Sequence, residues 1–290
     1  MLDQPTPADA ILRETIAGIE TILADQIDHI RIERVVVGLF FTGVKLDSGA
    51  AGACATPLRA IPEAVCCPSS ANALPFSGKL RRRPARGLLC ETGAANGLRR
   101  AIGIATMNAL ADMCWERRPY PGVRLQRGID AYDAADIRPG DTVAVVGAFV
   151  PFLKSLKKAG QRFTVLEMDP ATLKPDEMPY FRPADQAGAV LPEADVVLIT
   201  GTTLVNDTLA NLLALCRADT RVVVVGPTVS LLPDAFLRRG VDVLGSIRIT
   251  SPDLFLDMLA EGGSGYHFFG RAAEKIVLLR QAAYQTPEAA

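Results

Sequence analysis

The stretch at residues 195–208 reads DVVLITGTTLVNDT, and the stretch at residues 221–230 reads RVVVVGPTVS. Each begins with a short Val-rich run in which apolar and polar residues do not alternate. Such runs are typical of strands in a parallel sheet whose two faces are both covered by helices. Each run is followed by a glycine, which precedes Thr202 directly in the first stretch and Pro227-Thr228 in the second, and a helical segment comes next. We therefore expect parallel strands joined by helices in this half of the chain.

The same rhythm extends over residues 133–290, where short apolar runs alternate with segments of helical character. Alternation of this kind predicts a doubly wound, Rossmann-like parallel sheet. The expected strands are residues 142–147, 162–167, 195–200, 221–226 and 241–245. The expected helices are residues 150–159, 184–191, 204–217, 231–239, 252–261 and 267–283.

Residues 1–132 have a different pattern, which predicts a separate α+β domain. Apolar residues recur at three- and four-residue spacing in an amphipathic helix at the beginning, and two short apolar runs read as a hairpin through Thr42-Gly43. A Gly-, Ala-, Ser- and Pro-rich stretch is expected to form loops, and a helix rich in small residues follows. These segments are, in order, residues 7–28, 34–41 with 44–47, 48–87 and 97–114.

Composition excludes several classes of protein. The 290 residues include 31 Lys+Arg and 32 Asp+Glu, giving a net charge of −1, so the chain lacks the basic surface of a nucleic-acid binder. Its longest strongly apolar stretch, residues 143–153, is shorter than the roughly 20 residues that a membrane-spanning helix needs. The N-terminus does not resemble a secretory signal, and six cysteines do not make a disulfide scaffold. We expect a cytoplasmic protein; the subunit count stays open, with a homo-oligomer among the alternatives.

Ligands bind an open parallel sheet outside the carboxyl ends of its strands, so the loops that follow the expected strands are candidate sites. In the loop that starts at Gly147, Phe149 stands where the second glycine of a dinucleotide-binding motif would be, which disfavours that binding mode. In the next loop, Glu167 or Asp169 could accept hydrogen bonds from a ribose or another polar ligand. A solvated strand end is the structural alternative.

Two further loops share one design. After the strand ending at Thr200, Gly201 permits close approach of a ligand, and Thr202 or Thr203 is a candidate N-cap for a helix through Cys216. Backbone N–H groups at such a bend favour an anion, although threonine caps are also routine structural features. The other loop repeats the pattern with a second glycine. Together the two loops predict one pocket that contains Thr200, Gly201, Thr202, Thr203, Asn206, Gly226, Pro227 and Thr228.

Standard catalytic and metal motifs are absent from the sequence. The two histidines, His29 and His267, lack zinc-site spacing, and His267 is more consistent with the beginning of a helix. The adjacent Cys66 and Cys67 read as free thiols, and no P-loop or nucleophile elbow occurs.

Four segments together resemble a family of bacterial and archaeal heavy-metal chelation proteins. They are LITGTTLVNDT at residues 198–208, VVGPT at 224–228, GVDVLG at 240–245 and GIATMNA at 103–109. The resemblance implies an enolase N-terminal-like domain followed by a Rossmann-like domain, with a site at their junction. It also implies condensation or hydrolysis of small molecules related to pterins, flavins or metal chelators.

The leading hypothesis is a protein that binds a small anionic or heterocyclic ligand, or its metal complex, in a cleft between the two domains. The two glycine-threonine loops and Gly147 would hold the ligand, with Thr42, Val44 and Asn108 closing the cleft. Glu167 or Asp207 would be the acid or base of any reaction, because proton transfer needs a titratable group within hydrogen-bond reach. The cofactor is left open, a metal ion or a metal chelate being the candidates, and neither a nucleic acid nor a membrane is expected as partner.

Two alternatives remain. One is an enzyme that depends on S-adenosylmethionine or NAD, which the position of Phe149 weakens. The other is a non-catalytic metal-handling or sensor module in which Cys54, Cys66, Cys67 and Cys90 supply thiolate ligands for a soft metal.

Overall fold

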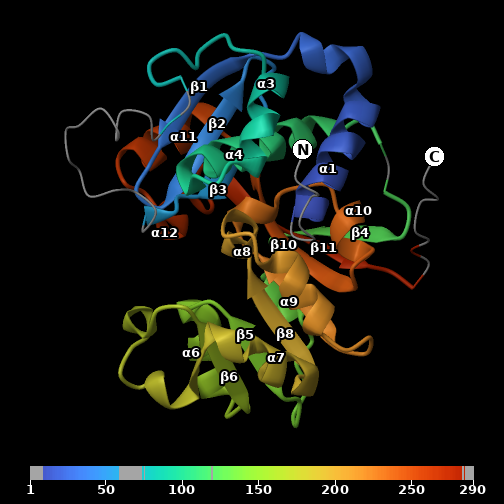
Figure 1. Cartoon of the computed structure of the whole chain (residues 1–290), viewed down its shortest axis with the longest axis vertical. Coiled ribbons are helices and arrows are strands. Elements are labelled where there is room, and N and C mark those ends of the chain that lie inside the picture. The colour runs from blue at the N-terminus through green and yellow to red at the C-terminus, as the bar shows by residue number, and fades with distance from the viewer. Residues whose placement is uncertain (1–8, 59–73, 75, 119, 283, 285–290) are drawn as a thin grey trace.

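The computed structural model describes residues 9–58, 74, 76–118, 120–282 and 284, and it consists of a small and a large β-sheet with helices packed around them (Figure 1). The strands are β1 (Ile32–Val37), β2 (Phe41–Leu46), β3 (Ala51–Ala55), β4 (Val123–Arg127), β5 (Val143–Val146), β6 (Phe163–Glu167), β7 (Phe181–Pro183), β8 (Val196–Thr200), β9 (Arg221–Val225), β10 (Val241–Ile249) and β11 (Ala273–Arg280).

The helices differ widely in length. The α-helices are α1 (Asp9–Leu23), α3 (Arg86–Leu89), α4 (Gly97–Trp115), α5 (Ala131–Ala134), α6 (Val150–Lys158), α7 (Ala187–Val190), α8 (Thr202–Val205), α9 (Leu209–Leu215), α10 (Asp234–Leu237), α11 (Pro252–Ala260) and α12 (Gly265–Phe268). The 3-10 helices are η1 (Ala24–Asp28), η3 (Cys90–Gly93), η4 (Pro170–Thr172), η5 (Met178–Tyr180), η6 (Ala184–Gln186), η7 (Leu191–Glu193) and η8 (Pro227–Val229).

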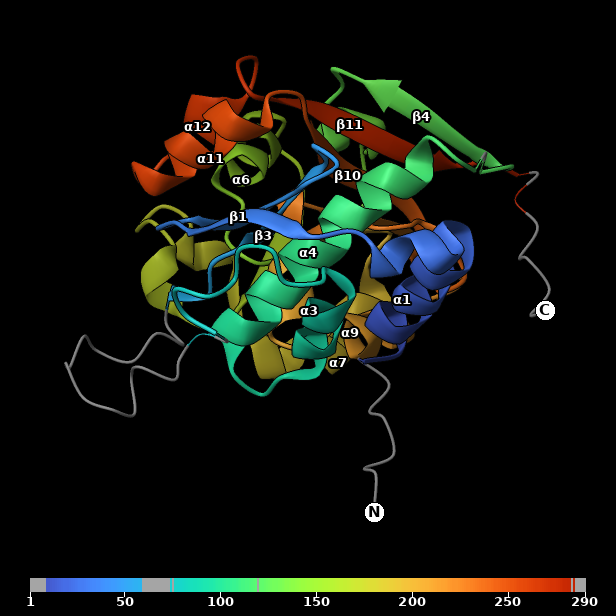
Figure 2. The same cartoon turned by 90° about the horizontal axis from the view of Figure 1, so that it is seen from above.

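The small sheet is antiparallel, has the order β1-β2-β3 and lies between two helices. Helix α4 packs on β2 and β3, and α11 packs on β1 and β2 from the other side (Figure 2). Close approach requires small residues: a Cβ atom added to Gly52 would lie 2.3 Å from the carbonyl oxygen of Ala105 in α4. A Cβ atom added to Gly43 would lie 2.5 Å from Leu256 Cδ2 in α11. The glycines therefore set the thickness of this layer.

The large sheet has the order β4-β11-β10-β9-β8-β5-β6-β7. Strands β5 to β10 are parallel to one another. At one edge of the sheet, β11 is antiparallel to β10, and β4 is antiparallel to β11. The parallel strands follow the order of doubly wound sheets, because the chain moves outward from β5 first in one direction and then in the other. The predicted fold class, a mixed α/β protein with a largely parallel second sheet, is confirmed.

Both faces of the large sheet are buried. Val143 and Val145 of β5 belong to one hydrophobic cluster, whereas Ala144 and Val146 belong to the cluster on the opposite face. Strands β8 and β9 show the same alternation between the two clusters. Residues 143–146, 196–199 and 222–225 are therefore all apolar, which explains the unbroken valine runs in the sequence.

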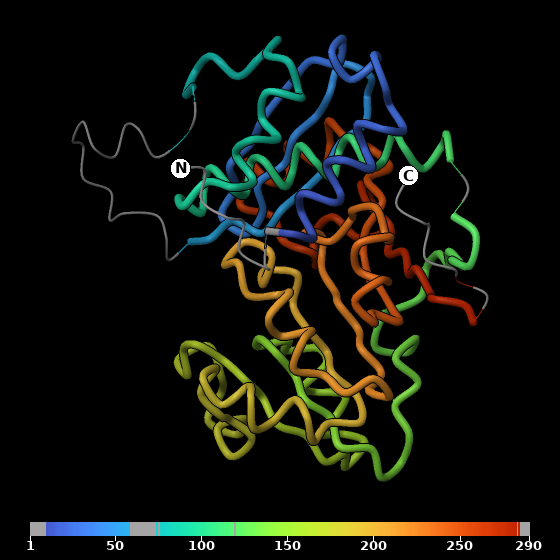
Figure 3. The backbone as a smooth tube through the Cα atoms, turned by 45° about the vertical axis from the view of Figure 1, so that its right-hand side comes forward, coloured from blue at the N-terminus to red at the C-terminus, as the bar shows by residue number. Residues whose placement is uncertain are grey.

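The two halves of the chain interlock. Strand β4, from the first predicted domain, pairs with β11, so that Leu125 lies opposite Leu278. Helix α11, from the second predicted domain, covers the small sheet, and Figure 3 shows the blue and teal N-terminal segments against the orange and red C-terminal ones. The boundary at residue 132 stays a prediction.

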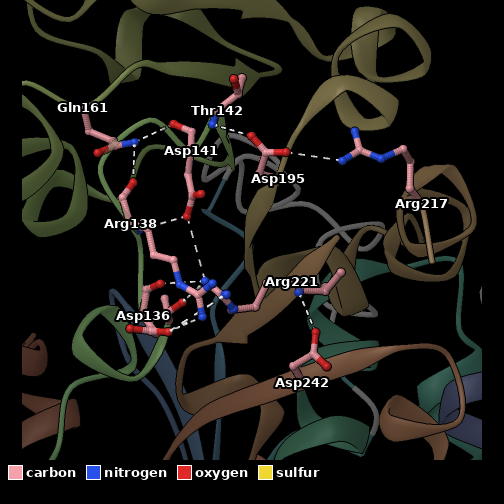
Figure 4. A network of polar contacts seen from close by, with 11 residues as sticks. Asp136, Arg138, Asp141, Thr142, Gln161, Asp195, Arg217, Arg221 and Asp242 are labelled. Carbon is pink, nitrogen blue, oxygen red and sulfur yellow. Dashed lines mark hydrogen bonds and ion pairs between the residues drawn. The ribbon is translucent and has the colours of Figure 1, made fainter. Parts of the chain in front are cut away.

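A polar network joins the loops at the amino ends of the parallel strands (Figure 4). Asp195 Oδ2 accepts a hydrogen bond from the Thr142 backbone N–H at 2.8 Å, and Asp195 Oδ1 lies 3.3 Å from Arg217. Asp242 Oδ2 accepts from the Val222 backbone N–H at 2.9 Å. These carboxylates tie strand ends together on the side opposite the carboxyl ends, which indicates a structural role.

The predicted helix at residues 267–283 is wrong. The short α12 ends at Phe268, and Ala273–Arg280 form strand β11. Because β11 pairs with β10 on one side and β4 on the other, sheet pairing outweighs its local helical spacing.

Other local predictions need smaller corrections. The hairpin is confirmed, but its turn lies at residues 38–40, where the Gly38 backbone N–H donates to Phe41 O. The loop predicted at residues 48–87 contains β3, and residues 59–73 and 75 lie outside the described residues. The predicted helix at 204–217 is two helices, α8 and α9, with Gly201 rather than a threonine as the first N-cap. The predicted helix at 184–191 is present as short consecutive segments, the 3-10 helix η6, the α-helix α7 and the 3-10 helix η7.

Among the described residues, none of the helices combines the length and the apolar character that crossing a bilayer requires.

Candidate functional site

The carboxyl ends of β8 and β9 and the loop after β5 border one cavity of about 780 Å³. Strand order reverses between β5 and β8, because β6 and β7 lie on one side of β5 while β8, β9 and β10 lie on the other. This is the place where open parallel sheets bind ligands. The hairpin tip of the small sheet and the segment around α12 also border the cavity, so both sheets contribute to its wall.

The two predicted glycine-threonine bends lie side by side. A Cβ atom added to Gly201 would lie 3.2 Å from Thr228 Cβ, and one added to Gly226 would lie 3.8 Å from the Gly201 nitrogen. The predicted residues that border the cavity are Thr200, Gly201, Thr202, Gly226, Pro227 and Thr228.

The amide hydrogens of the two glycines are already used within the protein. Gly201 N donates to Val225 O at 2.8 Å, and Gly226 N donates to Gly245 O at 2.9 Å. These bonds hold neighbouring strand ends together rather than leaving both amides for a ligand. Gly226 has φ +135° and ψ 164°, a conformation that is essentially restricted to glycine.

The loop after β5 packs directly against the end of β8. Gly147 has φ +99°, and a Cβ atom added to it would lie 2.8 Å from Thr200 Cγ2. Phe149 stacks on Phe152, with ring centroids 5.1 Å apart, and it borders the cavity. An aromatic ring therefore occupies the position of the second glycine in a dinucleotide-binding loop.

Thr203 and Asn206 follow the cavity wall but do not form part of it. Thr203 is buried, and its hydroxyl donates to Thr200 O at 2.6 Å. Asn206 is exposed, and its Oδ1 accepts from the Thr208 hydroxyl at 2.8 Å. Both side chains shape the turn between α8 and α9.

Asn108 joins α4 to both sheets behind the cavity. Its buried Nδ2 donates to Ala53 O at 2.7 Å and to Thr228 O at 3.0 Å. The Thr228 hydroxyl in turn accepts from the Ala55 backbone N–H. Asn108 therefore positions the bend at Thr228 against β3 instead of bordering the cavity.

Thr42 and Val44 are buried in the small sheet. The Thr42 hydroxyl lies 3.1 Å from the Thr56 hydroxyl, and Val44 is part of the main hydrophobic cluster. Both residues therefore belong to the packed small sheet beside the cavity and do not border the cavity.

Glu167 and Asp169 lie at the end of β6. Glu167 Oε2 accepts from the Ala148 backbone N–H at 3.0 Å, and its Oε1 accepts from the Met168 N–H at 2.7 Å. Asp169 Oδ1 accepts from the Ala171 N–H and begins η4. Neither side chain borders the cavity, so an acid or base role for Glu167 stays a prediction.

Asp207 is engaged with helix α4. Its Oδ1 lies 2.9 Å from Nη1 of Arg100, whose side chain is buried. Asp207 also has φ +67°, so the pair fixes a strained turn. Its catalytic role likewise stays a prediction.

The sequence reasoning missed most of the cavity wall. Five aromatic residues border the cavity, namely Phe40, Phe41, Phe149, Tyr266 and Phe269. They come from separate segments of the chain, and of the five the sequence analysis had singled out Phe149, in the loop after β5, while the exposed Tyr266 directly precedes His267. His267 lies in α12, and its Nδ1 accepts from the N–H of the N-cap residue Ser264 at 3.0 Å. Lys275 was missed because its strand was predicted as a helix.

The cysteines described in the structure are free thiols. Burial raises the pKa of Cys54 well above its ordinary value, which disfavours the thiolate form that binds soft metals. Cys90 is exposed, and Cys66 and Cys67 lie outside the described residues. Within the described ranges, no three His, Cys, Asp or Glu side chains gather as metal ligands would.

The chain is similar to uncharacterised archaeal and bacterial proteins. An uncharacterised protein of Methanocaldococcus jannaschii is 30% identical over 181 residues, which cover 59% of this chain and 62% of that protein. The match thus spans less than two thirds of the relative's length.

Two crystal structures of proteins with unknown function have the same fold. The one from Pyrococcus horikoshii has a TM-score of 0.70 and 20% identity, with 94% of this chain and 99% of that chain covered. The one from Desulfitobacterium hafniense has a TM-score of 0.69 and 22% identity, with 93% and 97% covered. Both are members of the DUF364 family.

Family profiles match both halves of the sequence. The DUF4213 profile covers residues 21–111, the DUF364 profile covers residues 130–278, and both carry the description "Putative heavy-metal chelation". The second match alone spans just over half of the chain. The protein therefore belongs to the DUF364 family, described as "Putative heavy-metal chelation".

Proposed function

We propose that the protein binds a small organic chelator, or the metal complex of one, in the cavity between its two sheets. The observation that carries the proposal is the cavity itself, which has a volume of about 780 Å³ and lies where strand order reverses. Small-molecule sites typically have volumes of about 300–1,000 Å³, with mainly apolar walls and a few polar groups. This cavity has that character, with aromatic rings beside Thr202 and Lys275.

The donor atoms in the wall fit a chelate better than a bare ion. Heavy metals prefer thiolate or imidazole ligands, and harder ions prefer carboxylates. Among the described residues that border the cavity there is no Cys, His, Asp or Glu. An organic ligand that already surrounds its metal needs none of these side chains, because it presents its own apolar and polar edges to the protein. The metal would then be bound by the ligand and not by protein side chains.

Binding is the part of the earlier hypothesis that the geometry supports. Thr200, Gly201, Thr202, Gly226, Pro227 and Thr228 form one continuous part of the wall. The candidate acids Glu167 and Asp207 are engaged with backbone N–H groups and with Arg100, respectively. Condensation or hydrolysis is therefore not included in the proposal.

A thermal-shift screen tests the proposal, because a ligand that binds only the folded protein raises its melting temperature. The screen compares iron(III), nickel(II) and zinc(II) salts with complexes and metal-free forms of quinaldate, bipyridine and citrate. We expect at least one chelator or complex, and no bare salt, to raise the melting temperature. Thr202→Phe, which places a ring in the cavity, should abolish that shift.

Thr21→Phe is the matched control, because Thr21 is an exposed threonine on α1 away from the cavity. It should retain the full shift. A shift that survives Thr202→Phe would place the ligand elsewhere, and equal shifts with bare salts would contradict the preference for a chelate.

A further inference from the structure

Lys275 is the one charged side chain among the described residues that border the cavity. It projects from β11 and also borders a smaller extension of about 190 Å³, which shares Phe149, Gly226 and Phe269 with the main cavity. Its side chain is 44% exposed, so the ammonium group is accessible. A cationic donor thus stands at the junction of the two spaces.

The position of this ammonium group is fixed by its neighbours. Lys275 Nζ donates to Asp130 Oδ2 at 2.5 Å, while Asp130 Oδ1 accepts from the Tyr132 backbone N–H at 2.9 Å and caps α5. Nζ also lies 5.3 Å from the centroid of the Phe269 ring, within the range of a cation–π contact. An ammonium group has three N–H donors, and Asp130 uses one of them, which leaves donors for a ligand.

Asp130 does not oppose an anion in the main cavity directly. It borders the extension and not the main cavity, whereas Lys275 borders both. Of this ion pair, Lys275 is therefore the member that borders the main cavity. An acidic group in the main cavity shares its wall with the lysine and not with the carboxylate.

Aromatic side chains surround the space beside Lys275. Phe149 is held in place by stacking on Phe152, with an angle of 21° between the rings. Phe269 contacts Phe268, which also packs edge-on against Phe41. Tyr266 is 85% exposed at the rim. Offset or edge contacts with such side chains stabilise a bound flat ring by more than the burial of its apolar area alone would.

We propose that the cavity selects flat aromatic molecules that carry an oxyanion group, with the oxyanion on Lys275 Nζ and the ring packed against Phe149 and Phe269. This inference rests on the proposed function and names the class of molecule that the site takes. Carboxylates and phosphates share the required chemistry, so the experiment includes both.

The test measures fluorescence-detected binding of naphthoate, naphthyl phosphate and the neutral naphthamide to the full chain. We expect wild type to bind an acid at least about tenfold more tightly than naphthamide, since a hydrogen bond to a charged group contributes at this level. Whichever acid binds more tightly identifies the group as carboxylate or phosphate. An equal affinity for acid and amide overturns the inference, and this comparison requires no variant.

Lys275→Met removes the charge and retains the length of the side chain. It should weaken binding of the preferred acid by about 10-fold to 100-fold and leave naphthamide binding unchanged. Lys275→Arg should retain the preference for the acid. Lys158→Met, at an exposed lysine near the end of α6, makes the same change away from the cavity and should have no effect.

The outcomes separate this inference from the proposed function. Acid binding that is insensitive to Lys275→Met, or no binding of any naphthalene probe to wild type, overturns the inference. If citrate or bipyridine complexes still give a shift that Thr202→Phe abolishes, the proposed function stands without it. Probe binding that persists in Thr202→Phe contradicts the proposed location itself.

Discussion

Arg100 and Asp207 form an ion pair, with 2.9 Å between Nη1 and Oδ1, that connects helix α4 to the turn between α8 and α9. The Arg100 side chain is buried, and its Nη1 also lies 3.5 Å from Val205 O. The pair therefore fixes the segment that follows the Thr200–Thr202 part of the cavity wall.

Replacing Asp207 by Asn should destabilise the protein. Asn keeps the shape of the side chain and tolerates the positive φ, but it removes the negative charge beside the buried guanidinium of Arg100. We expect the free energy of unfolding to fall by about 3 kcal/mol, as measured by urea denaturation. Asp219→Asn, at an exposed acid paired with Arg217, should change it by less than about 1 kcal/mol. Equal effects of the two variants would contradict the structural role of Asp207.

Stability should depend on pH through Glu14, which joins α1 to the segment after α10. Hydrogen bonds from Arg239 and Arg238 lower the pKa of this carboxyl from 4.5 to about 2. The ion pairs of Glu14 with the two arginines therefore stabilise the folded state above about pH 5, and this contribution disappears as the pH falls from about 5 toward 2. Glu14→Gln should cost about 1 kcal/mol at neutral pH, because the site is partly exposed.

Urea denaturation at neutral pH and in steps down to about pH 3 checks this prediction, with the difference between wild type and Glu14→Gln shrinking as the pH falls. Glu261→Gln, at an exposed residue after α11, serves as the control and should differ from wild type by a small, constant amount. A Glu14→Gln difference that stays constant over the same range would refute the assignment.

Gly226→Ala should destabilise the bend in the cavity wall. The added methyl group has space, because the nearest atom lies 3.8 Å away, but the backbone conformation strongly disfavours any side chain. Strain of this kind costs about 1–3 kcal/mol. Gly188→Ala, in helix α7 with open space around it, should be neutral or stabilise by up to about 1 kcal/mol. Chemical denaturation of both variants gives the comparison, and a neutral Gly226→Ala would show that the bend adapts.

The described cysteines should differ sharply in reactivity. Burial raises the pKa of Cys114 to about 12 and that of Cys216 to about 11, and it raises that of buried Cys54 further. Cys90 is exposed, so it should react first with iodoacetamide in the folded protein, followed by mass spectrometry of the peptides. Rapid labelling of Cys54 without denaturant would instead favour the thiolate metal module.

The parallel strands were predictable because burial on both faces of the sheet requires an uninterrupted run of apolar residues in the sequence. Neighbouring valines such as Val196 and Val197 belong to opposite clusters, so the whole strand must be apolar. Strand β11 does not have such an uninterrupted apolar run, because Glu274 and Lys275 lie within it. Its spacing of Ala273, Ile276 and Val277 is also that of a helix face, and only pairing with β10 and β4 decides between the two.

The site was predictable to the extent that it follows strand ends. The bends at Gly201 and Gly226 follow neighbouring parallel strands, so their convergence could be inferred from the sequence. The aromatic wall could not, because Phe40, Phe149 and Tyr266 come from three distant segments that only the folded chain brings to one cavity.

Helix α11 has a consequence for how a ligand reaches the cavity. Since it is contributed from beyond β10 yet covers the sheet built by residues 32–55, the halves cannot swing apart without exposing apolar surface such as Leu256. A hinge opening is therefore costly. We expect a ligand to enter past the exposed Phe40 and Tyr266 at the rim of the cavity while the two halves stay together.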